Sequence, residues 1–266
     1  MKYKNPPVVE TVLSVQFNPL RNFGAGQLGA YWNELGTEWP NVTEAPGVEP
    51  EYERFERAPV WEQAAILRFS SKLDVRLQIR NTARDRMIQV QNGRFFYNWL
   101  KTSGVEYPSY ESVRPEFDEH WDRFREFSLS HLHESALQLN QWEIIYVNHI
   151  PRETVWQELS DLPNVFTFLR QPVLEGVCIS ADGIGGEWRY EIEPKKGRLY
   201  VRIGMTVRKD DEVPCVVLTL VSRGPVGNGT SLNEGLKLGH ETITQAFDSF
   251  TTADAKKIWG VQDARK

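Results

Sequence analysis

Two short patterns occur twice along the chain in the same order, and this repetition constrains what the sequence can fold into. The copies read WNEL at 32–35 with PNV at 40–42, and WQEL at 156–159 with PNV at 163–165. A β-rich run that ends in proline precedes each copy, at 12–19 and at 144–151. We therefore expect two related halves, each of which begins with a strand and a short helix.

The later parts of the two halves also correspond. Asn92-Gly93 and Lys196-Gly197 each lie between alternating strand patterns and predict hairpin tips. Each half then ends in an apolar stripe of helical spacing. The stripes are Val113, Phe117, Trp121, Phe124 and Ser128 in the first half, and Leu232, Leu236, His240, Ile243 and Phe247 in the second. We expect Trp32, Trp121 and Trp156 to be buried on such helical stripes.

Strand periodicity and a helix cap complete the fold prediction. Val75, Leu77 and Ile79 alternate with polar residues, as in a strand with one covered face. The segment from Ser231 to Glu234 has the spacing of a capping box and predicts a helix start. We predict an α+β fold with internally duplicated, helix-grip-like halves, each built as strand, helix, antiparallel meander and long helix. Residues 1–133 would form the first repeat and 137–266 the second, packed as one compact unit.

Composition restricts the classes of protein to be considered. The 266 residues carry a formal net charge of −5, which disfavours a nucleic-acid partner unless a local basic patch forms. No run approaches the roughly 20 apolar residues of a membrane span, and the N-terminal residues lack the apolar core of an export signal. Cys178 and Cys215 are too few for a disulfide framework, so we expect reduced thiols in a cytoplasmic protein.

Several segments resemble a sporadically distributed family of uncharacterised bacterial proteins. They are NPPVVE at 5–10, QVQNGR at 89–94 followed by Asn98-Trp99, YPSY at 107–110, and a C-terminal pattern of His240, Phe250 and Ile258-Trp-Gly260. The resemblance spans nearly the whole chain. It implies an accessory bacterial component, of a defence, toxin–antitoxin or phage-related kind, and it implies no activity.

Motifs for catalysis and for cofactors are incomplete. The glycine-rich segment 224–231 has the spacing of a phosphate-binding loop, but Thr230 stands where the lysine of such a loop is required, so we expect a turn before a capped helix. His131 and His133 diverge at a helix end and lack the other ligands of a metal site. We therefore predict no catalytic residues, no metal and no cofactor.

His149 and His240 are candidate ligand-binding residues. His240 takes the place on the second stripe that Trp121 takes on the first, and His149 alternates with Ile145 and Val147 on a strand. Three interpretations stay open: satisfied core histidines, a small-ligand site in a cleft between sheet and helix, and an acid/base pair of a hydrolase.

Aromatic and arginine residues give the last candidates. Trp99, Tyr107 and Tyr110, together with Arg94, either pack beneath a helix or anchor a protein partner. A sheet face that combines Arg76, Arg80, Arg86, Arg94, Arg198 and Arg202 with Tyr97 and Tyr200 could bind nucleic acid, but we favour a solvated face paired with Glu191 and Glu193. The first functional expectation is a non-catalytic protein-binding or adaptor component. A small-ligand binder is the alternative, and a hydrolase that uses His149 and His240 comes third.

Overall fold

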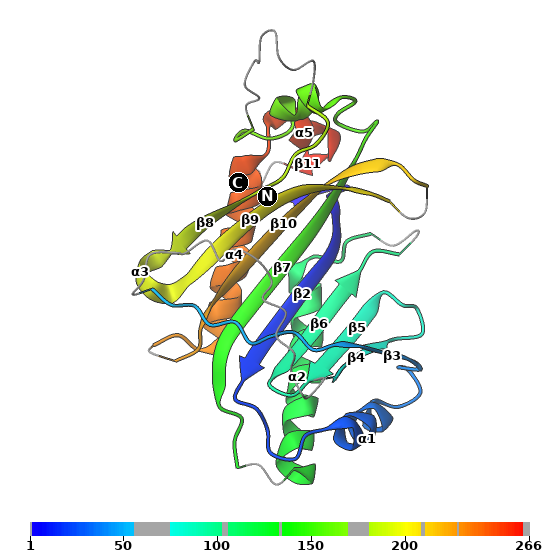
Figure 1. Ribbon diagram of the computed structural model, residues 1–266, viewed down its shortest axis with the longest axis vertical. Helices are drawn as coiled ribbons and strands as arrows, with labels where there is room; N and C mark the ends of the chain where they lie inside the picture. Colours follow the sequence, from blue (N-terminus) through cyan, green and yellow to red (C-terminus); the bar gives the residue numbers. More distant parts are fainter. Residues whose placement is uncertain are drawn as a thin grey trace.

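The computed structural model describes residues 2–55, 75–102, 106–132, 135–169, 181–208, 211–227 and 229–262. Within these ranges the fold is α+β and is organised around one large antiparallel sheet (Figure 1). A separate ribbon pairs β1 (Lys2–Tyr3) with β11 (Val261–Gln262) and brings the two ends of the chain together.

The large sheet has nine strands in the order β3-β4-β5-β6-β2-β7-β10-β9-β8. The strands are β2 (Val8–Phe17), β3 (Asn41–Pro46), β4 (Val75–Arg80), β5 (Arg86–Gln91), β6 (Arg94–Leu100), β7 (Leu139–Pro151), β8 (Gly186–Ile192), β9 (Gly197–Val207) and β10 (Pro214–Pro225). Each neighbouring pair is antiparallel. The pair β2 and β7 lies at the centre and joins the strands of the first half of the chain to those of the second.

The helices are α1 (Ala25–Leu35), α2 (Tyr110–His131), the 3₁₀ helix η1 (Leu159–Asn164), the single turn α3 (Glu193–Lys196), α4 (Leu232–Phe250) and α5 (Ala253–Ile258). The two long helices α2 and α4 cover the same face of the sheet (Figure 1). Under α2, Phe124 stacks on Phe95 of β6 with ring centroids 5.4 Å apart, and Trp121 is 95% buried. We call this covered side the helix face of the sheet.

Helix α4 approaches the sheet closely because glycines surround one tryptophan. Trp142 of β7 is fully buried beneath the helix. A Cβ atom on Gly235 would lie 2.2 Å from Trp142 Cδ1, and one on Gly239 would lie 2.7 Å from Trp142 Cζ3. Gly197 and Gly224 leave comparable space on the sheet side of the indole, so these four glycines allow the helix and three strands to close around Trp142.

The opposite side of the sheet carries the chain segment that follows β3. Figure 1 shows residues 47–55, in blue, crossing the front of the strands toward β9 and β10. We call these residues the strap, and the sheet side beneath them the strap face. The side chains on this face are mainly polar, and Gln16, Arg94 and Glu143 are all buried there.

The structure confirms some of the local expectations and corrects others. The capping box is present, with Ser231 Oγ accepting from Glu234 N at 3.2 Å, and α4 begins at the expected place. Trp121 and Trp156 are buried, whereas Trp32 is half-buried and donates its indole N–H to Trp39 O. The expectation of a short α-helix around Trp156 is wrong. Trp156 precedes a 3₁₀ helix that contains Pro163, whose ring disfavours an α-helical turn before it.

Candidate functional site

A cavity of about 420 Å³ lies on the helix face, between the central strands, the start of α2 and the middle of α4. We call it the interhelical cavity. Its walls are largely aromatic and aliphatic, and a small polar group lies among them. The lining residues that matter below are Tyr107, Tyr110, Tyr146, Asn148, His240 and Phe247.

Two tyrosines and a histidine form a hydrogen-bonded chain in this cavity. Tyr107 Oη donates to Tyr146 Oη at 3.1 Å, and Tyr146 Oη lies 3.0 Å from His240 Nδ1. The Tyr146 oxygen accepts from Tyr107, and its hydroxyl donates to Nδ1 in the tautomer of the neutral imidazole that carries its proton on Nε2. The ring of Tyr110 lies flat on His240, with centroids 3.9 Å apart and planes 4° apart.

Burial keeps these three hydrogen-bonded side chains uncharged. Loss of water lowers the pKa of His240 below 6.5, with the carboxylates of Glu111 and Glu241 opposing the shift. Burial raises the pKa of Tyr107 to about 12 and raises that of Tyr146 as well. At neutral pH the cavity therefore presents neutral hydroxyl and imidazole groups beside apolar walls, with the exposed Glu111 as its acidic lining residue. This lining suits an uncharged ligand that can stack and hydrogen-bond.

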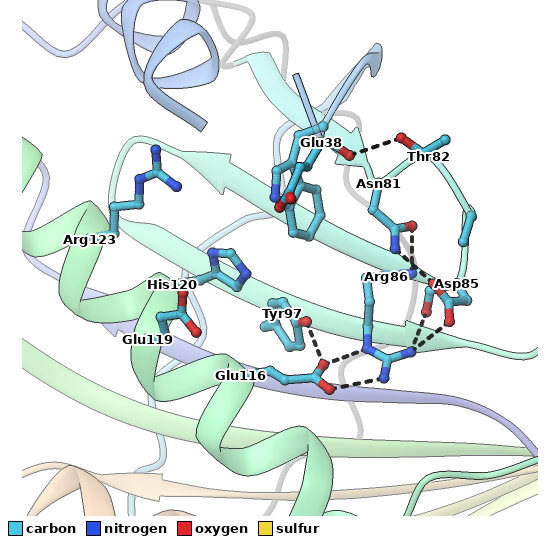
Figure 2. Close-up of a pocket in the computed structure, with 12 residues that line it drawn as sticks. Glu38, Asn81, Thr82, Asp85, Arg86, Tyr97, Glu116, Glu119, His120 and Arg123 are labelled. Atoms are coloured by element: carbon cyan, nitrogen blue, oxygen red, sulfur yellow. Dashed lines mark hydrogen bonds and ion pairs between the residues drawn. The ribbon is translucent and has the colours of Figure 1, made fainter. Parts of the chain in front are cut away.

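A second, more polar cavity of about 590 Å³ lies beside the middle of α2 (Figure 2). Arg86 of β5 binds both oxygens of Glu116 of α2, at 2.5 and 3.0 Å, and also contacts Asp85 at 3.0 Å. Tyr97 Oη donates to the same Glu116 carboxylate at 2.7 Å. Although burial alone would raise the pKa of Glu116, these hydrogen bonds from Arg86 and Tyr97 lower it.

His120 lies beside this ion pair and is held by aromatic rings. Its imidazole stacks on Tyr97 with centroids 5.3 Å apart and meets the edge of Trp39 at 5.0 Å. Burial lowers its pKa, and Nδ1 has no hydrogen-bond partner within the described residues. The Arg86 guanidinium and the Glu116 carboxylate already satisfy each other here, so we regard the interhelical cavity as the stronger candidate ligand site.

The structure brings three of the sequence-predicted site residues together. Tyr107, Tyr110 and His240 all line the interhelical cavity, although the first two were expected as partner anchors and the third as a ligand-binding residue. Trp99 lies behind them, with its ring 5.1 Å from that of Tyr107, and it is fully buried. Of the two interpretations left open for Trp99, packing or a partner anchor, this burial favours packing.

Arg94 and His149 lie elsewhere. Arg94 is buried on the strap face, where it forms an ion pair with Glu143, so it offers no surface anchor. His149 alternates with Tyr146 along β7 and therefore points to the strap face, away from His240. The proposed acid/base pair of His149 and His240 is not formed, since the sheet separates the two rings.

The expected arginine and tyrosine face is also divided. Arg86 and Tyr97 point to the helix face and contact Glu116, whereas Arg198 and Tyr200 lie on the strap face. The expected partners Glu191 and Glu193 are not the ones found. Arg202 pairs at 2.5 Å with Glu187, its cross-strand neighbour, whereas Arg198 pairs at 2.7 Å with Glu53 of the strap, although Glu191 lies opposite it in the register of β8 and β9.

Sequence reasoning missed Tyr146 and Asn148 as cavity residues. Both alternate with His149 on β7 and so belong to the opposite face from it, a signal that the strand pattern does contain. It also missed the pairing of Arg86 with Glu116, which joins a strand to a helix 30 positions away and leaves no periodic signal.

Comparisons with known proteins find no relative: no family model, curated protein or solved structure matches the chain. No helix within the described ranges is long and apolar enough to cross a membrane. In that same part of the chain, no group of three or more His, Cys, Asp and Glu side chains could hold a metal ion. Cys215 is buried and unpaired with another cysteine, and Cys178 falls outside the described residues.

Proposed function

We propose that the protein is a non-catalytic binding protein that holds a small, flat and mainly apolar molecule in the interhelical cavity. The observation that carries this proposal is the hydrogen-bonded chain of Tyr107, Tyr146 and His240 in the wall of that cavity. Buried hydroxyl and imidazole groups among apolar side chains are what a ligand pocket uses to orient its ligand.

The volume of the cavity and the aromatic stack in its wall limit the class of ligand. A volume of about 420 Å³ suits a molecule of one or two rings. Because Tyr110 and His240 already form a flat stack, a planar ligand can extend that stack, and a hydroxyl or carbonyl on it can share a hydrogen bond with the Tyr146 hydroxyl.

The same geometry favours binding over catalysis. His240 Nδ1 is held by the Tyr146 hydroxyl, and its ring is covered on one side by Tyr110. A base for catalysis needs a pKa near the working pH and access to a substrate proton, whereas burial lowers the pKa of this imidazole. A hydrolase that depends on His149 and His240 receives no support, since the two rings lie on opposite faces.

A defined probe set tests the proposal. Fluorine NMR with 5-fluoroindole and 4-fluorophenol measures binding by the broadening of each fluorine signal on addition of protein. We expect binding to the wild type and at least tenfold weaker binding to Tyr146→Phe, which keeps the ring and removes the hydroxyl. Tyr190→Phe is the matched control, because Tyr190 is 42% exposed and does not line the cavity. Equal binding to all three proteins, or no binding of either probe, would contradict the proposal.

We also infer that residues 1–133 and 137–266 are two copies of one unit. The central strands β2 and β7 have corresponding neighbours, β6 on one side and β10 on the other. Arg114 Nη2 lies 2.5 Å from Asn233 Oδ1, and these residues are 119 positions apart, the offset between the two helical stripes. The different structures around Trp32 and Trp156 require the copies to have diverged there. An experimental structure in which α2 and α4 take non-equivalent positions on their half-sheets would refute the duplication.

The role of an adaptor in an accessory bacterial system stays a separate proposal. It rests on the resemblance of the sequence to the bacterial family, and of its expected anchors only Tyr107 and Tyr110 are partly accessible. Capture of partners by the wild type and by Tyr110→Ala, compared per folded molecule, tests it. Equal capture by the two would remove Tyr110 as an anchor.

A further inference from the structure

The strap is attached to the sheet mainly through its backbone. Three glutamines on the strap face, Gln91 of β5, Gln16 of β2 and Gln141 of β7, form one cross-strand row with Arg94 of β6. All three glutamine side chains are at least 95% buried beneath the strap. This row runs in the direction in which the strap crosses the sheet (Figure 1).

Each glutamine uses both ends of its carboxamide on strap backbone atoms. Gln91 accepts from Val48 N at 2.8 Å and donates to Val48 O at 2.7 Å. Gln16 accepts from Glu51 N at 3.1 Å and donates to Glu51 O at 3.2 Å. Gln141 accepts from Glu53 N at 3.0 Å and donates to Glu51 O at 2.7 Å. Such contacts depend on an extended backbone and are indifferent to the side chains of the bound segment.

Two strap carboxylates contact arginines of the sheet: Glu51 pairs with Arg223, and Glu53 is buried among several donors. The Glu53 carboxylate accepts from Arg198 at 2.7 Å, from Arg223 at 2.6 Å and from the Tyr200 hydroxyl at 2.7 Å, and its side chain is only 3% exposed. Arg198 also lies over the ring of Phe55 at 4.7 Å. Burial lowers the pKa of Arg223 to about 10, because loss of water disfavours the charged form.

The strap buries little apolar surface of its own. Glu49, Pro50 and Glu51 are exposed, and Tyr52, the largest apolar side chain among the exposed strap residues, is 51% exposed. The segment is therefore held by hydrogen bonds and by the ion pairs of Glu51 and Glu53, with a small hydrophobic contribution. A second extended segment with a carboxylate in the same register could make the same contacts.

We propose that the glutamine row and the two arginines form a groove for an extended acidic peptide of a partner protein, and that the strap occupies this groove in the free molecule. The charge balance argues for an acidic occupant. Arg94 has Glu143 of the sheet as its partner, whereas Arg198 obtains its buried carboxylate from the strap. Removal of the strap takes Glu53 from Arg198 and takes both Glu51 and Glu53 from Arg223. Within the described residues, only Glu143, 3.4 Å from Arg223 and shared with Arg94, stays as a carboxylate partner in the groove, which therefore becomes positive.

This inference is independent of the interhelical cavity, which lies on the other face of the sheet. It gives the expected protein-binding role a specific surface. Because the strap is part of the same chain, its effective concentration is of the order of millimolar, and a partner peptide must compete with it. A test therefore has to weaken the strap while leaving the groove unchanged.

Glu53→Lys in the full-length chain weakens the strap and leaves the groove unchanged, because it places a cation beside Arg198 and Arg223. The probe is a fluorescein-labelled peptide with the sequence of residues 46–55, and fluorescence anisotropy measures its dissociation constant. Glu49→Lys is the matched control, since it makes the same charge change at an exposed strap position. We expect the peptide to bind Glu53→Lys at least tenfold more tightly than the wild type or Glu49→Lys, and a peptide that carries lysine in place of glutamate at position 53 to bind none of them.

Three results would overturn the proposal. A folded Glu53→Lys protein, with wild-type circular dichroism, that does not bind the peptide would show that the groove accepts no segment in trans. An unfolded Glu53→Lys protein would show that the strap is an obligatory part of the fold. A concentration-dependent dimer of the wild type in light scattering, abolished in Glu53→Lys, would assign the groove to strap exchange between two copies of this chain.

Discussion

Substitution of Gly235 by alanine tests how α4 is seated on the sheet. The added Cβ would lie 2.2 Å from Cδ1 and 2.4 Å from Nε1 of Trp142, far inside van der Waals contact. The indole cannot move away easily, since Cβ positions on Gly197 and Gly224 lie 3.0 and 2.8 Å from its Cζ2 on the other side. Removal of this overlap therefore requires α4 to shift away from the sheet.

The expected loss of stability is the difference of two effects. Forced overpacking of a core costs about 1–3 kcal/mol, and more where the backbone must move. Alanine in place of glycine inside a helix stabilises it by about 1 kcal/mol. The contact with Trp142 is closer than side-chain adjustment can relieve, so we expect a net loss of about 2 kcal/mol in the free energy of unfolding.

Urea unfolding followed by circular dichroism measures this change, and Gly29→Ala is the control. Gly29 lies inside α1 with no atom within 4 Å of its ideal Cβ position, so alanine there should stabilise the protein by up to about 1 kcal/mol. If both variants raise stability to the same extent, α4 does not rest on Trp142 as described, and the reasoning fails.

Three further predictions concern buried groups. Because burial lowers the pKa of His240, the unfolded chain binds this proton more readily, and stability is lost as pH falls below 6.5; His240→Gln should therefore show a smaller drop in Tm between about pH 7.5 and 5.5 than the wild type. Trp121→Ala should lower the free energy of unfolding by about 3–5 kcal/mol, and an unchanged urea midpoint would argue against its place under α2. The Cys215 thiol, whose pKa burial raises, should react slowly with iodoacetamide until urea unfolds the chain, and rapid labelling of the folded protein would contradict its burial.

The parts of the fold that were predictable are those with local signals. The Asn92-Gly93 turn, the capping box at Ser231 and the alternation of Leu77 with polar neighbours each depend on residues close in sequence, and each appears in the structure. The α-helix expected around Trp156 failed because the repeat implied the same local structure in both halves. Pro163 changes the backbone preferences there, and the local effect prevailed.

The candidate site was only partly predictable, for a geometric reason. The apolar stripes predict two long helices, one after Tyr110 and one that contains His240, but they contain no information on how the helices pass each other. The placement of the two helices depends on the approach of α4 to Trp142 and on the direction in which α2 runs relative to α4. For His149 the alternation was correct, yet a period of two assigns residues to a shared face without identifying which face a helix covers.

The central pair of β2 and β7 also determines the order in which the sheet can be completed during synthesis. Strand β2 is synthesised well before its central partner, because Leu13 pairs with Ile144, more than a hundred residues later. Until then β2 can pair only with β6, and its other edge stays open to unwanted strands. The nascent first half thus has to tolerate an exposed, largely apolar strand edge for several seconds at about 5–20 residues per second, so this edge is where misassembly or chaperone contact would begin.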